Sequence, residues 1–476
     1  MPDMYDIVII GGGPGGYVAA IRAAQMGGRV ALVEMERVGG CCLNRGCIPT
    51  KTLYRSVEDY LDVQQAELFG IEVQGEAKVN FGKMMARKDE VVETLVGTVI
   101  ELMKAHRIDI YDGKGQILEA GLVRVTPSVW FPAAEVQDIR GKAIIIATGS
   151  VPARVPIPGT DLPGVVTSRG LLELKTFPKS MVVIGASVVG LEFACMFHAL
   201  GCKVTLLGRQ TFMKAADEQL AKRFRSGLAR SGVAVTIGVD FESITQNDDG
   251  TLSVHYSQRG KSESAQGEIV LLSTGRTPYT EDLGVSEIGL AVEGPKVIVN
   301  EHLATNVPGI YAIGDVLGTY MMAHSASYEG EVAVENALGH RRAADYRAVP
   351  YAIFTFPQVA GVGLTERQAK DLGIDYVVAR FPFSASGKAL AIADQEGQVR
   401  MICEKDADGM GGRVLGVHIM GPEAVDLISE ATLAVQLNAT AKEIAETIHA
   451  HPTLPEAFME AAKAAAFGEA IHYRKV

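Results

Sequence analysis

The chain carries one local pattern twice, and any fold must accommodate both copies. In the first copy, an apolar run at 6–10 leads into a glycine loop, an Ala-rich stretch and a second apolar run that ends at Glu34. The short runs predict buried strands, and the Ala-rich stretch predicts a helix. Gly11, Gly13 and Gly16 form the pattern G-x-G-x-x-G. Such glycines suit a tight turn, close approach to a pyrophosphate and packing of the helix on the strand. The first copy therefore predicts a dinucleotide site, with phosphates at the helix N-terminus and a ribose on Glu34.

The second copy spans 181–207 and has the same order of apolar run, loop, helical stretch and apolar run. Each copy is followed later in the chain by an apolar strand that ends in Thr-Gly, at Thr148-Gly149 and at Thr274-Gly275. Two such units predict an α/β fold with two Rossmann-like dinucleotide-binding domains. The stretch from 350 to 476 is predicted to form a further mixed α/β domain.

The second loop departs from the first in two ways. Gly185 and Gly190 are kept, but Ser187 replaces the middle glycine. Its Cβ hinders close approach of the backbone, although its hydroxyl can bond a phosphate. Glu34 follows Gly11 by 23 residues, whereas the same step from Gly185 reaches Gly208, with Arg209 next. A missing ribose-binding acid beside a cation favours the 2′-phosphate of NADP, with a weakened NAD site as the alternative.

Composition excludes several other classes of protein. The net charge is −11 and no basic run stands out, so we expect no nucleic-acid partner. No apolar stretch reaches the ~18 residues of a membrane span. The first residues enter an apolar strand without a basic leader, which predicts a cytoplasmic protein or a processed organelle protein. Of six cysteines, Cys41, Cys42 and Cys47 cluster without a nearby His or a C-x-x-C pair. The cluster therefore predicts redox chemistry and no metal site.

Cys42 and Cys47 are five residues apart at the start of a helical stretch. One helical turn plus a residue can bring their Cβ atoms together if the helix is distorted, and we expect Pro49 to help distort it. A thiolate near a helix N-terminus is stabilised by the helix dipole. Lys51 lies four residues beyond Cys47, on the same face if the helix continues. The pair can thus cycle between disulfide and dithiol beside a cation.

The segment 40–51 resembles the active-site loop of the flavoprotein pyridine nucleotide-disulfide oxidoreductases, in the version of the dihydrolipoamide dehydrogenase branch. The resemblance implies FAD as a cofactor. It also implies that Cys42 exchanges with the substrate, that Cys47 contacts the flavin and that Lys51 pairs with Glu192 near the flavin. Cys41 stands where the family usually has Thr. We expect a small packed residue there, with a part in alternative disulfides as the other possibility.

The segment 449–458 resembles the family's His-x-His-Pro-Thr-Leu-x-Glu motif, with His451 as the catalytic base and Glu456 as its partner. The chemistry agrees, because a thiol with a pKa of ~8.5 must lose its proton near neutral pH and a carboxylate-paired imidazole can take it. Thr453 and Glu456 also match a capping box that opens the next helix. In the family this histidine acts across a dimer interface, so the resemblance implies a homodimer.

The resemblance carries further positions to the two nucleotide sites. Asp315 matches the residue that binds the ribityl chain of the flavin. The other positions expected at the FAD are Gly115, Thr148, Gly149, Ser150, Met322, Ala323 and His324. Those expected at the nicotinamide nucleotide are Gly185, Ser187, Gly190, Gly208, Arg209 and Gly275.

The resemblance covers essentially the whole chain. It implies an FAD-binding domain in two parts, 1–150 and 276–346, an NAD(P)-binding domain at 151–275 and an interface domain at 347–476. The implied reaction is oxidation of dihydrolipoyl groups on carrier domains, or of a small dithiol, by NAD or NADP. A glutathione or mercuric ion substrate in the same family is the nearest alternative, although the motifs argue against both. A mainly structural subunit of a multienzyme complex is the alternative of a different class.

Overall fold

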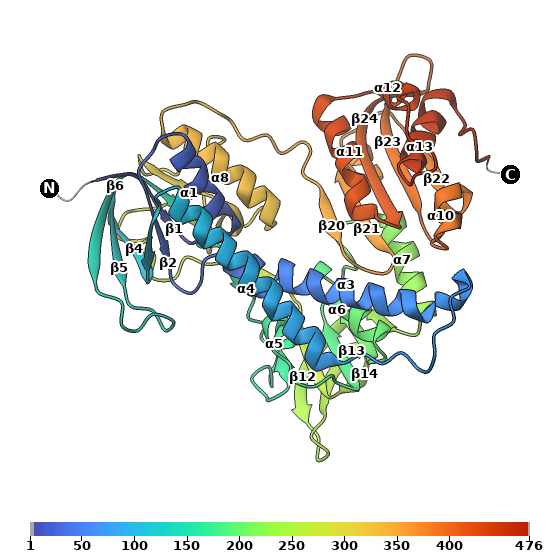
Figure 1. Cartoon of the computed structure of the whole chain (residues 1–476), viewed down its shortest axis with the longest axis horizontal. Helices are drawn as coiled ribbons and strands as arrows, with labels where there is room; N and C mark the ends of the chain where they lie inside the picture. The colour runs from blue at the N-terminus through green and yellow to red at the C-terminus, as the bar shows by residue number, and fades with distance from the viewer. Residues whose placement is uncertain (1–3, 475–476) are drawn as a thin grey trace. The chain divides into compact units, whose positions relative to one another are not determined.

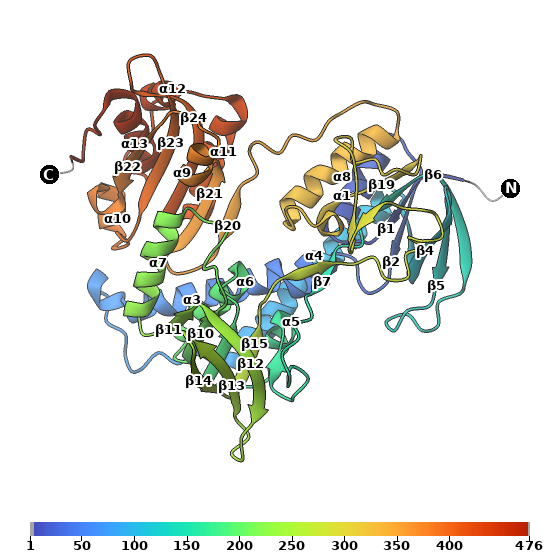
Figure 2. The same ribbon diagram turned by 180° about the vertical axis from the view of Figure 1, so that it is seen from behind.

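The structure is a computed structural model that describes residues 4–474. It divides into two compact units, which are described separately. Unit 1 comprises the chain up to Val155 together with Thr167–Phe177 and Thr274–Ala344. Unit 2 comprises Pro156–Val166, Pro178–Ser273 and the chain from Asp345 onward. Figures 1 and 2 show their elements from opposite sides. The mixed α/β architecture agrees with the predicted fold class, and the four-segment division stays a prediction.

A parallel sheet forms the centre of unit 1, in the order β3-β2-β1-β6-β19. The strands are β1 (Tyr5–Ile10), β2 (Val30–Glu34), β3 (Asp109–Asp112), β6 (Gln137–Ile146) and β19 (Ile310–Ala312). The long β6 continues into an antiparallel meander with β5 (Leu122–Thr126) and β4 (Lys114–Glu119). In a parallel sheet all carboxyl ends lie at one edge, so the loops after β1, β2 and β6 come together there.

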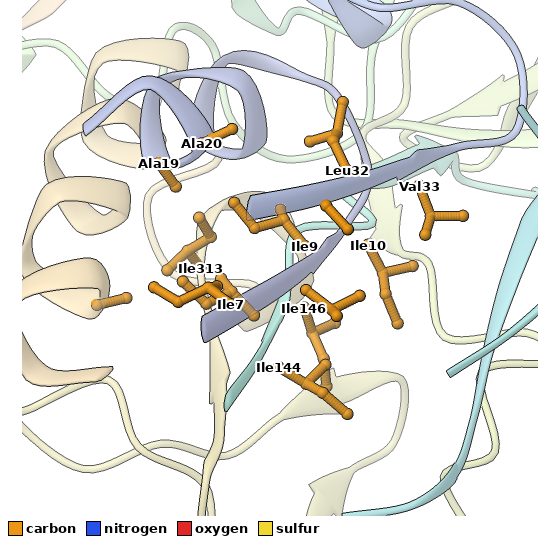
Figure 3. Close-up of a cluster of buried hydrophobic side chains, with 14 of the residues drawn as sticks. Ile7, Ile9, Ile10, Ala19, Ala20, Leu32, Val33, Ile144, Ile146 and Ile313 are labelled. Atoms are coloured by element: carbon orange, nitrogen blue, oxygen red, sulfur yellow. The ribbon is translucent and has the colours of Figure 1, made fainter. Parts of the chain in front are cut away.

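Helices α1 (Pro14–Gln25) and α8 (Ala323–Ala337) lie side by side in unit 1 (Figure 1). They approach closely because Gly330 has no side chain, since a Cβ there would lie 2.7 Å from the carbonyl oxygen of Gly15. Ala19 and Ala20 of α1 face fully buried isoleucines of the sheet, among them Ile7 and Ile144 (Figure 3). This core fixes the start of α1 against the carboxyl end of β1.

Further helices of unit 1 carry the cysteines and the segments around them. They are α2 (Gly40–Arg45), α3 (Cys47–Gln64), η1 (Ala66–Phe69), α4 (Phe81–Ala105), α5 (Ser168–Leu172) and η2 (Gly314–Leu317). The short strands are β7 (Ser150–Pro152), which pairs with β16 (Arg276–Pro278), and β17 (Val292–Glu293), which pairs with β18 (Lys296–Val297). The helical stretch expected after the paired cysteines is present as α3.

Unit 2 repeats the parallel sheet in the order β11-β10-β9-β15-β8. Its strands are β8 (Val165–Val166), β9 (Ser180–Ile184), β10 (Lys203–Gly208), β11 (Ala234–Ile237) and β15 (Ile269–Leu272). Helix α6 (Val188–Ala199) follows the second glycine loop, and α7 (Glu218–Arg230) precedes β11. An antiparallel sheet adds β12 (Val239–Gln246), β13 (Leu252–Gln258) and β14 (Lys261–Gly267). The corresponding strand order in the two units confirms the predicted duplication.

The C-terminal part of unit 2 is an antiparallel sheet in the order β20-β21-β24-β23-β22, packed against α11 and α13 (Figure 2). Its strands are β20 (Tyr351–Ile353), β21 (Gln358–Gly363), β22 (Tyr376–Pro382), β23 (Gln398–Lys405) and β24 (Gly411–Gly421). The helices are α9 (Glu366–Asp371), η3 (Phe383–Ala385), α10 (Gly387–Ala391), α11 (Ala424–Leu437), α12 (Ala441–Glu446) and α13 (Glu456–Phe467). Within residues 4–474, no helix has the length and apolar character needed to cross a membrane.

Candidate active site and nucleotide sites

Two glycines of the first loop pack closely against backbone atoms, whereas the third, Gly13, has open space beside it. Gly11 has φ +107°, and a Cβ there would lie 2.3 Å from the carbonyl oxygen of Ala147. A Cβ on Gly16 would lie 1.8 Å from the carbonyl oxygen of Gly11. For Gly13 the nearest atom is the Cα of Gly40 at 3.9 Å. No side chain caps the N-terminus of α1. The loop therefore fits a pyrophosphate, which a helix N-terminus binds through its N–H groups.

Glu34 ends β2 and is buried, with 7% of its surface exposed. Its carboxylate accepts hydrogen bonds from the backbone N–H of Gly12 at 2.6 Å and of Glu36 at 2.8 Å. Burial raises the pKa of Glu34 above its usual value, although the two N–H groups oppose this shift. The carboxylate is thus fixed at the carboxyl edge of the sheet, next to the glycine loop, where a ribose can reach it.

Asp315 lies in η2 within a polar cluster that the sequence did not reveal. The Ser150 hydroxyl donates to Asp315 Oδ2 at 2.5 Å, and Arg276 Nε donates to the same hydroxyl at 2.7 Å. The Arg276 guanidinium lies 3.7 Å from the Asp315 carboxylate. The buried Glu329 accepts the backbone N–H of Gly314 at 2.6 Å and so positions the turn before Asp315. The one sequence signal for the contact of Arg276 with Asp315 is that Arg276 directly follows Gly275, a residue expected at a nucleotide site.

The remaining positions expected at the FAD lie in the same unit. The Thr148 hydroxyl donates to the carbonyl oxygen of Tyr279 at 2.6 Å. Gly115 packs over β1, where a Cβ would lie 2.9 Å from Ile10 Cγ2. Helix α8 begins at Ala323 with no side-chain cap on its N-cap residue Met322. Gly149 has φ +72° and His324 is exposed. The uncapped start of α8 presents N–H donors of the kind that an anionic flavin oxygen can use.

Cys42 and Cys47 lie on either side of a break between two helices. Helix α2 ends at Arg45, and Cys47 is the first residue of α3. The first hydrogen bond of α3 runs from the N–H of Thr50 to the carbonyl oxygen of Gly46 at 3.1 Å. The prediction that Pro49 distorts the helix is wrong. Proline sits in the first turn of α3, where its missing N–H costs no hydrogen bond, and the break falls at Gly46 instead.

The two thiols interact directly, because a side-chain hydrogen bond joins Cys42 to Cys47. This bond, together with burial and the neighbouring Cys41, raises the pKa of Cys42 above its usual value. Cys47 is exposed and Cys42 is partly buried. A thiolate on Cys47 gains from the positive end of α3, whose 18 residues give the dipole its full strength. The geometry thus separates an outward sulfur at a helix start from a protonated neighbour.

The half-buried Cys41 lies against the break, where its carbonyl oxygen would be 2.9 Å from a Cβ on Gly46.

Tyr17 of α1 was not singled out by the sequence. Burial, followed by the nearby sulfurs of Cys42 and Cys47, raises the pKa of Tyr17. A tyrosine on a helix gives no sequence signal of such a neighbourhood, because the contact depends on how α1 packs.

His451 is held by Glu456 in unit 2. The His451 Nδ1 atom lies 2.9 Å from Glu456 Oε1, and the other carboxylate oxygen accepts the N–H of Thr453 at 2.8 Å. Although burial opposes it, these two donors keep the pKa of Glu456 below its usual value. The His451 side chain is 77% exposed. The pair therefore presents Nε2 outward with Nδ1 fixed on a carboxylate, which suits an acid–base group.

The predicted capping box at Thr453 is only half present. Glu456 accepts the backbone N–H of Thr453, but the Thr453 hydroxyl donates to the carbonyl oxygen of Ala450 at 2.6 Å. The N-cap of α13 is Pro455. The prediction that Thr453 is the N-cap residue is thus wrong, because α13 begins only at Glu456.

The second nucleotide loop repeats the shape of the first. A Cβ on Gly185 would lie 2.5 Å from the carbonyl oxygen of Ser273, and a Cβ on Gly190 would lie 2.3 Å from that of Gly185. Ser187 caps α6, since its hydroxyl accepts the N–H of Gly190 at 3.3 Å and donates to Ser273 at 2.8 Å. The hydroxyl is therefore already engaged, in contrast to the expectation that it bonds a phosphate.

Gly208 ends β10 and is buried between Ala186 and Ile237. Arg209 follows it and is exposed, and within residues 4–474 it makes no ion pair. Gly275 has φ +116°, and a Cβ added there would meet no atom within 4 Å.

Glu192 is buried in α6 and accepts the N–H of Phe354 at 3.0 Å. The pairing of Glu192 with Lys51 stays a prediction.

Comparison with known proteins identifies relatives along the whole chain. The family model for pyridine nucleotide-disulphide oxidoreductases matches residues 5–330, and the model for their dimerisation domain matches 349–462. The chain is 40% identical to dihydrolipoyl dehydrogenase of Bacillus subtilis, over 99% of this chain and 100% of the relative. It is 39% identical to the mitochondrial dihydrolipoyl dehydrogenase of Homo sapiens, over 98% and 92% of the two chains.

Solved structures agree with this assignment. LpdA from Mycobacterium tuberculosis superposes with a TM-score of 0.88 at 25% identity, covering 96% of this chain and 98% of the other. The Cu(II) complex of the HOCl-induced flavoprotein disulfide reductase RclA from Escherichia coli gives a TM-score of 0.85 at 28% identity, covering 97% and 99%. In the described part of the chain, no group of three or more His, Cys, Asp or Glu residues is placed to hold a metal ion.

Proposed function

Because the chain belongs to the pyridine nucleotide-disulphide oxidoreductases and is an FAD-dependent dithiol–disulfide oxidoreductase, we propose that its substrate is a dihydrolipoyl group. The observation that carries this proposal is the hydrogen-bonded pair of thiols on Cys42 and Cys47, in a chain that aligns with dihydrolipoyl dehydrogenases over 98–99% of its length. The lipoyl group is taken either as a free dithiol or on a carrier domain.

In the oxidised enzyme, Cys42 and Cys47 form a disulfide. A substrate thiolate attacks Cys42 Sγ, which forms a mixed disulfide and releases Cys47 as a thiolate. The second substrate thiol gives its proton to His451 Nε2 and then attacks the substrate sulfur of the mixed disulfide. Cys42 leaves as a thiolate and takes up the proton held by His451, so the substrate becomes a cyclic disulfide while the enzyme holds Cys42 as a thiol and Cys47 as a thiolate. The bound FAD supplies the transfer of these two electrons onward to the nicotinamide.

The roles of the two cysteines follow from their places on the helices. Cys47 starts α3, whose N-terminus stabilises the thiolate released in the first step. The hydrogen bond to Cys47 and burial raise the pKa of Cys42, so we assign Cys42 as the neutral partner that exchanges with substrate. Glu34, Asp315 and the uncapped starts of α1 and α8 would hold the FAD.

His451 completes the site from a partner copy of the chain. Its side chain is 77% exposed although Glu456 fixes its orientation, and it lies in the segment that the dimerisation model matches. By contrast, the nearby His449 is 6% exposed, with its two ring nitrogens 2.9 Å from Thr447 and 3.0 Å from Glu430. An oriented but uncovered imidazole is what a homodimer with a shared site requires.

We propose NADP(H) as the preferred nicotinamide nucleotide. Gly208 supplies no carboxylate to bind a ribose hydroxyl pair or to repel a phosphate. Arg209 is exposed beside it, and Lys214 is exposed five residues further on. A charge-assisted contact to a 2′-phosphate is worth about 1.5–3 kcal/mol, which corresponds to roughly 10- to 150-fold in affinity.

The test is steady-state oxidation of dihydrolipoamide by NAD and by NADP, with wild type and Arg209→Ala. We expect turnover with dihydrolipoamide, a higher kcat/KM for NADP, and a loss of that preference by roughly tenfold or more in the variant. Lys203→Ala, an exposed lysine at the opposite end of β10, is the charge-matched control. Absence of dihydrolipoamide turnover in flavin-loaded enzyme would refute the substrate. A strong preference for NAD that Arg209→Ala leaves unchanged would refute the nucleotide assignment.

A further inference from the structure

The connection between β5 and β6 contains a fixed turn over Ser128–Phe131. The backbone N–H of Ser128 donates to the carbonyl oxygen of Phe131 at 3.3 Å, and the reverse bond is 3.2 Å. The Ser128 hydroxyl accepts the N–H of Trp130 at 3.3 Å and that of Phe131 at 3.1 Å. The same hydroxyl donates to the carbonyl oxygen of Met35 at 2.6 Å. The turn is therefore anchored to the residue that directly follows Glu34.

Trp130 stands at the tip of this turn and is the single tryptophan of the chain. Half of its surface is exposed, at 50%. The guanidinium of Arg169 lies over the indole with its Cζ 5.1 Å from the ring centroid. An exposed tryptophan on a tightly bonded turn, with a cation over its ring, presents a flat aromatic surface on which a planar ligand can stack.

A short chain of contacts leads from Trp130 to the ribose-binding carboxylate. Arg169 forms an ion pair with Glu36 at 3.3 Å. The backbone N–H of Glu36 in turn donates to Glu34 at 2.8 Å. Together with the bond from Ser128 to Met35, this places the turn beside the end of β2 on two independent connections. All these residues belong to unit 1.

We propose that Trp130 forms a wall of the site for the adenosine half of FAD, with its uncovered indole face against the adenine. This inference rests on the proposed function, in which Glu34 holds the adenosine ribose. The adenine lies one glycosidic bond beyond that ribose, so its ring must lie close to the segment that follows Glu34. A base offers a flat π surface to an indole, and Arg169 on the far face adds a cation–π contact that keeps the indole in place.

The experiment uses full-length protein from which the flavin has been removed, with ADP as a probe for the adenosine half and FAD as the complete ligand. Because Trp130 is the single tryptophan, fluorescence excited beyond the tyrosine absorption reports on this side chain alone. We expect ADP to quench the emission in a saturable way. Trp130→Ala should weaken ADP and FAD by roughly tenfold each, as loss of one base–aromatic stack does. FAD binding to the variants is followed through the flavin emission.

Two further variants make the result specific. Trp130→Phe keeps an aromatic face and should restore most of the affinity. Val129→Ala changes the neighbouring residue of the same turn, which is 90% exposed, and should leave both affinities as in wild type. Equal affinities in Trp130→Ala and wild type, with no quenching by ADP, would overturn the inference while FAD binding persisted. Failure of the wild-type apoprotein to bind FAD at all would instead overturn the proposed function.

Discussion

Gly13→Ala tests whether glycine at this position is required for cofactor binding and not for folding. In the structure a Cβ at this position has no atom nearer than the Cα of Gly40 at 3.9 Å. The backbone has φ −68° and ψ −175°, which alanine adopts without strain. Alanine lowers the entropy of the unfolded chain, which stabilises by about 0.4–1 kcal/mol, and it is a poorer N-cap than glycine by a similar amount. We therefore expect the apoprotein to change in stability by less than about 1 kcal/mol.

The same methyl group stands where the loop would approach a pyrophosphate. Displacing the phosphate by the width of a methyl group would lengthen a hydrogen bond from the start of α1 to an anion, which is worth about 1.5–3 kcal/mol. The dissociation constant for FAD should therefore rise roughly 10- to 150-fold. Gly16→Ala differs, because its Cβ would lie 1.8 Å from the carbonyl oxygen of Gly11. Relief requires movement of backbone, so this variant should lose about 1–3 kcal/mol or more of stability.

The assay pairs thermal denaturation of the apoprotein with titration of FAD, followed by quenching of the flavin emission. Gly97→Ala in α4, where a Cβ would meet no atom within 4 Å, is the control for a harmless glycine replacement. An FAD affinity for Gly13→Ala within twofold of the wild-type value would refute this reasoning. So would an apoprotein of Gly13→Ala as unstable as that of Gly16→Ala, since the structure shows no clash for the first.

Three further predictions concern the cysteines, the histidine and the C-terminal helix. Cys42→Ser should show a long-wavelength band from a Cys47 thiolate beside oxidised flavin, and Cys47→Ser should lack it; the opposite pattern would reverse the assignment. His451→Gln should slow the dithiol half-reaction about 10²- to 10⁴-fold in stopped-flow measurements and the nicotinamide half-reaction far less, whereas equal slowing would make His451 structural. Glu460 accepts the backbone N–H of His472 at 3.0 Å and the ammonium of Lys463 at 3.0 Å, and although burial opposes it these donors keep the pKa of Glu460 below the usual value. A lowered pKa stabilises the fold above the unfolded value of about 4.3, and this contribution is lost as pH falls, so Glu460→Gln should unfold with less dependence on acid below pH ~5. An unchanged acid limb would contradict this account.

The sequence predicted those parts of the fold whose signal is local. The apolar run at 6–10 became β1 with both ends correct to within one residue, and the run that begins at 181 became β9, which begins at Ser180, because a buried strand is bounded by loop residues that cannot continue it. The apolar strand expected before Thr274-Gly275 is present as β15 (Ile269–Leu272). Helix α1 begins at Pro14, ahead of the Ala-rich stretch, since proline is well placed in a first helical turn.

What the sequence could not predict depends on contacts between distant segments. The break beside Cys47 was expected at Pro49, yet the chain bends at Gly46, where a Cβ would press on the carbonyl oxygen of Cys41. The partners of Asp315 come from segments more than 30 residues away in sequence, at Ser150 and Arg276. No spacing rule connects such positions. The candidate cysteines and the His451–Glu456 pair could be named in advance because each motif is contained within a few residues.

The two glycine loops share one backbone shape but differ in whether a side chain caps the helix that follows. At the first loop, no side chain caps α1, so the N–H groups of its first turn are available to a pyrophosphate. At the second loop, the Ser187 hydroxyl already engages the N–H of Gly190. A ligand there must compete with this cap, so the helix start contributes less to its binding free energy. Side chains must therefore supply more of the binding free energy at the second loop. Arg209 and Lys214 are exposed cations in the segment that follows β10. A site that relies on such side chains gains most from an extra phosphate on the ribose, and this links the replacement of a glycine by Ser187 to the proposed preference for NADP.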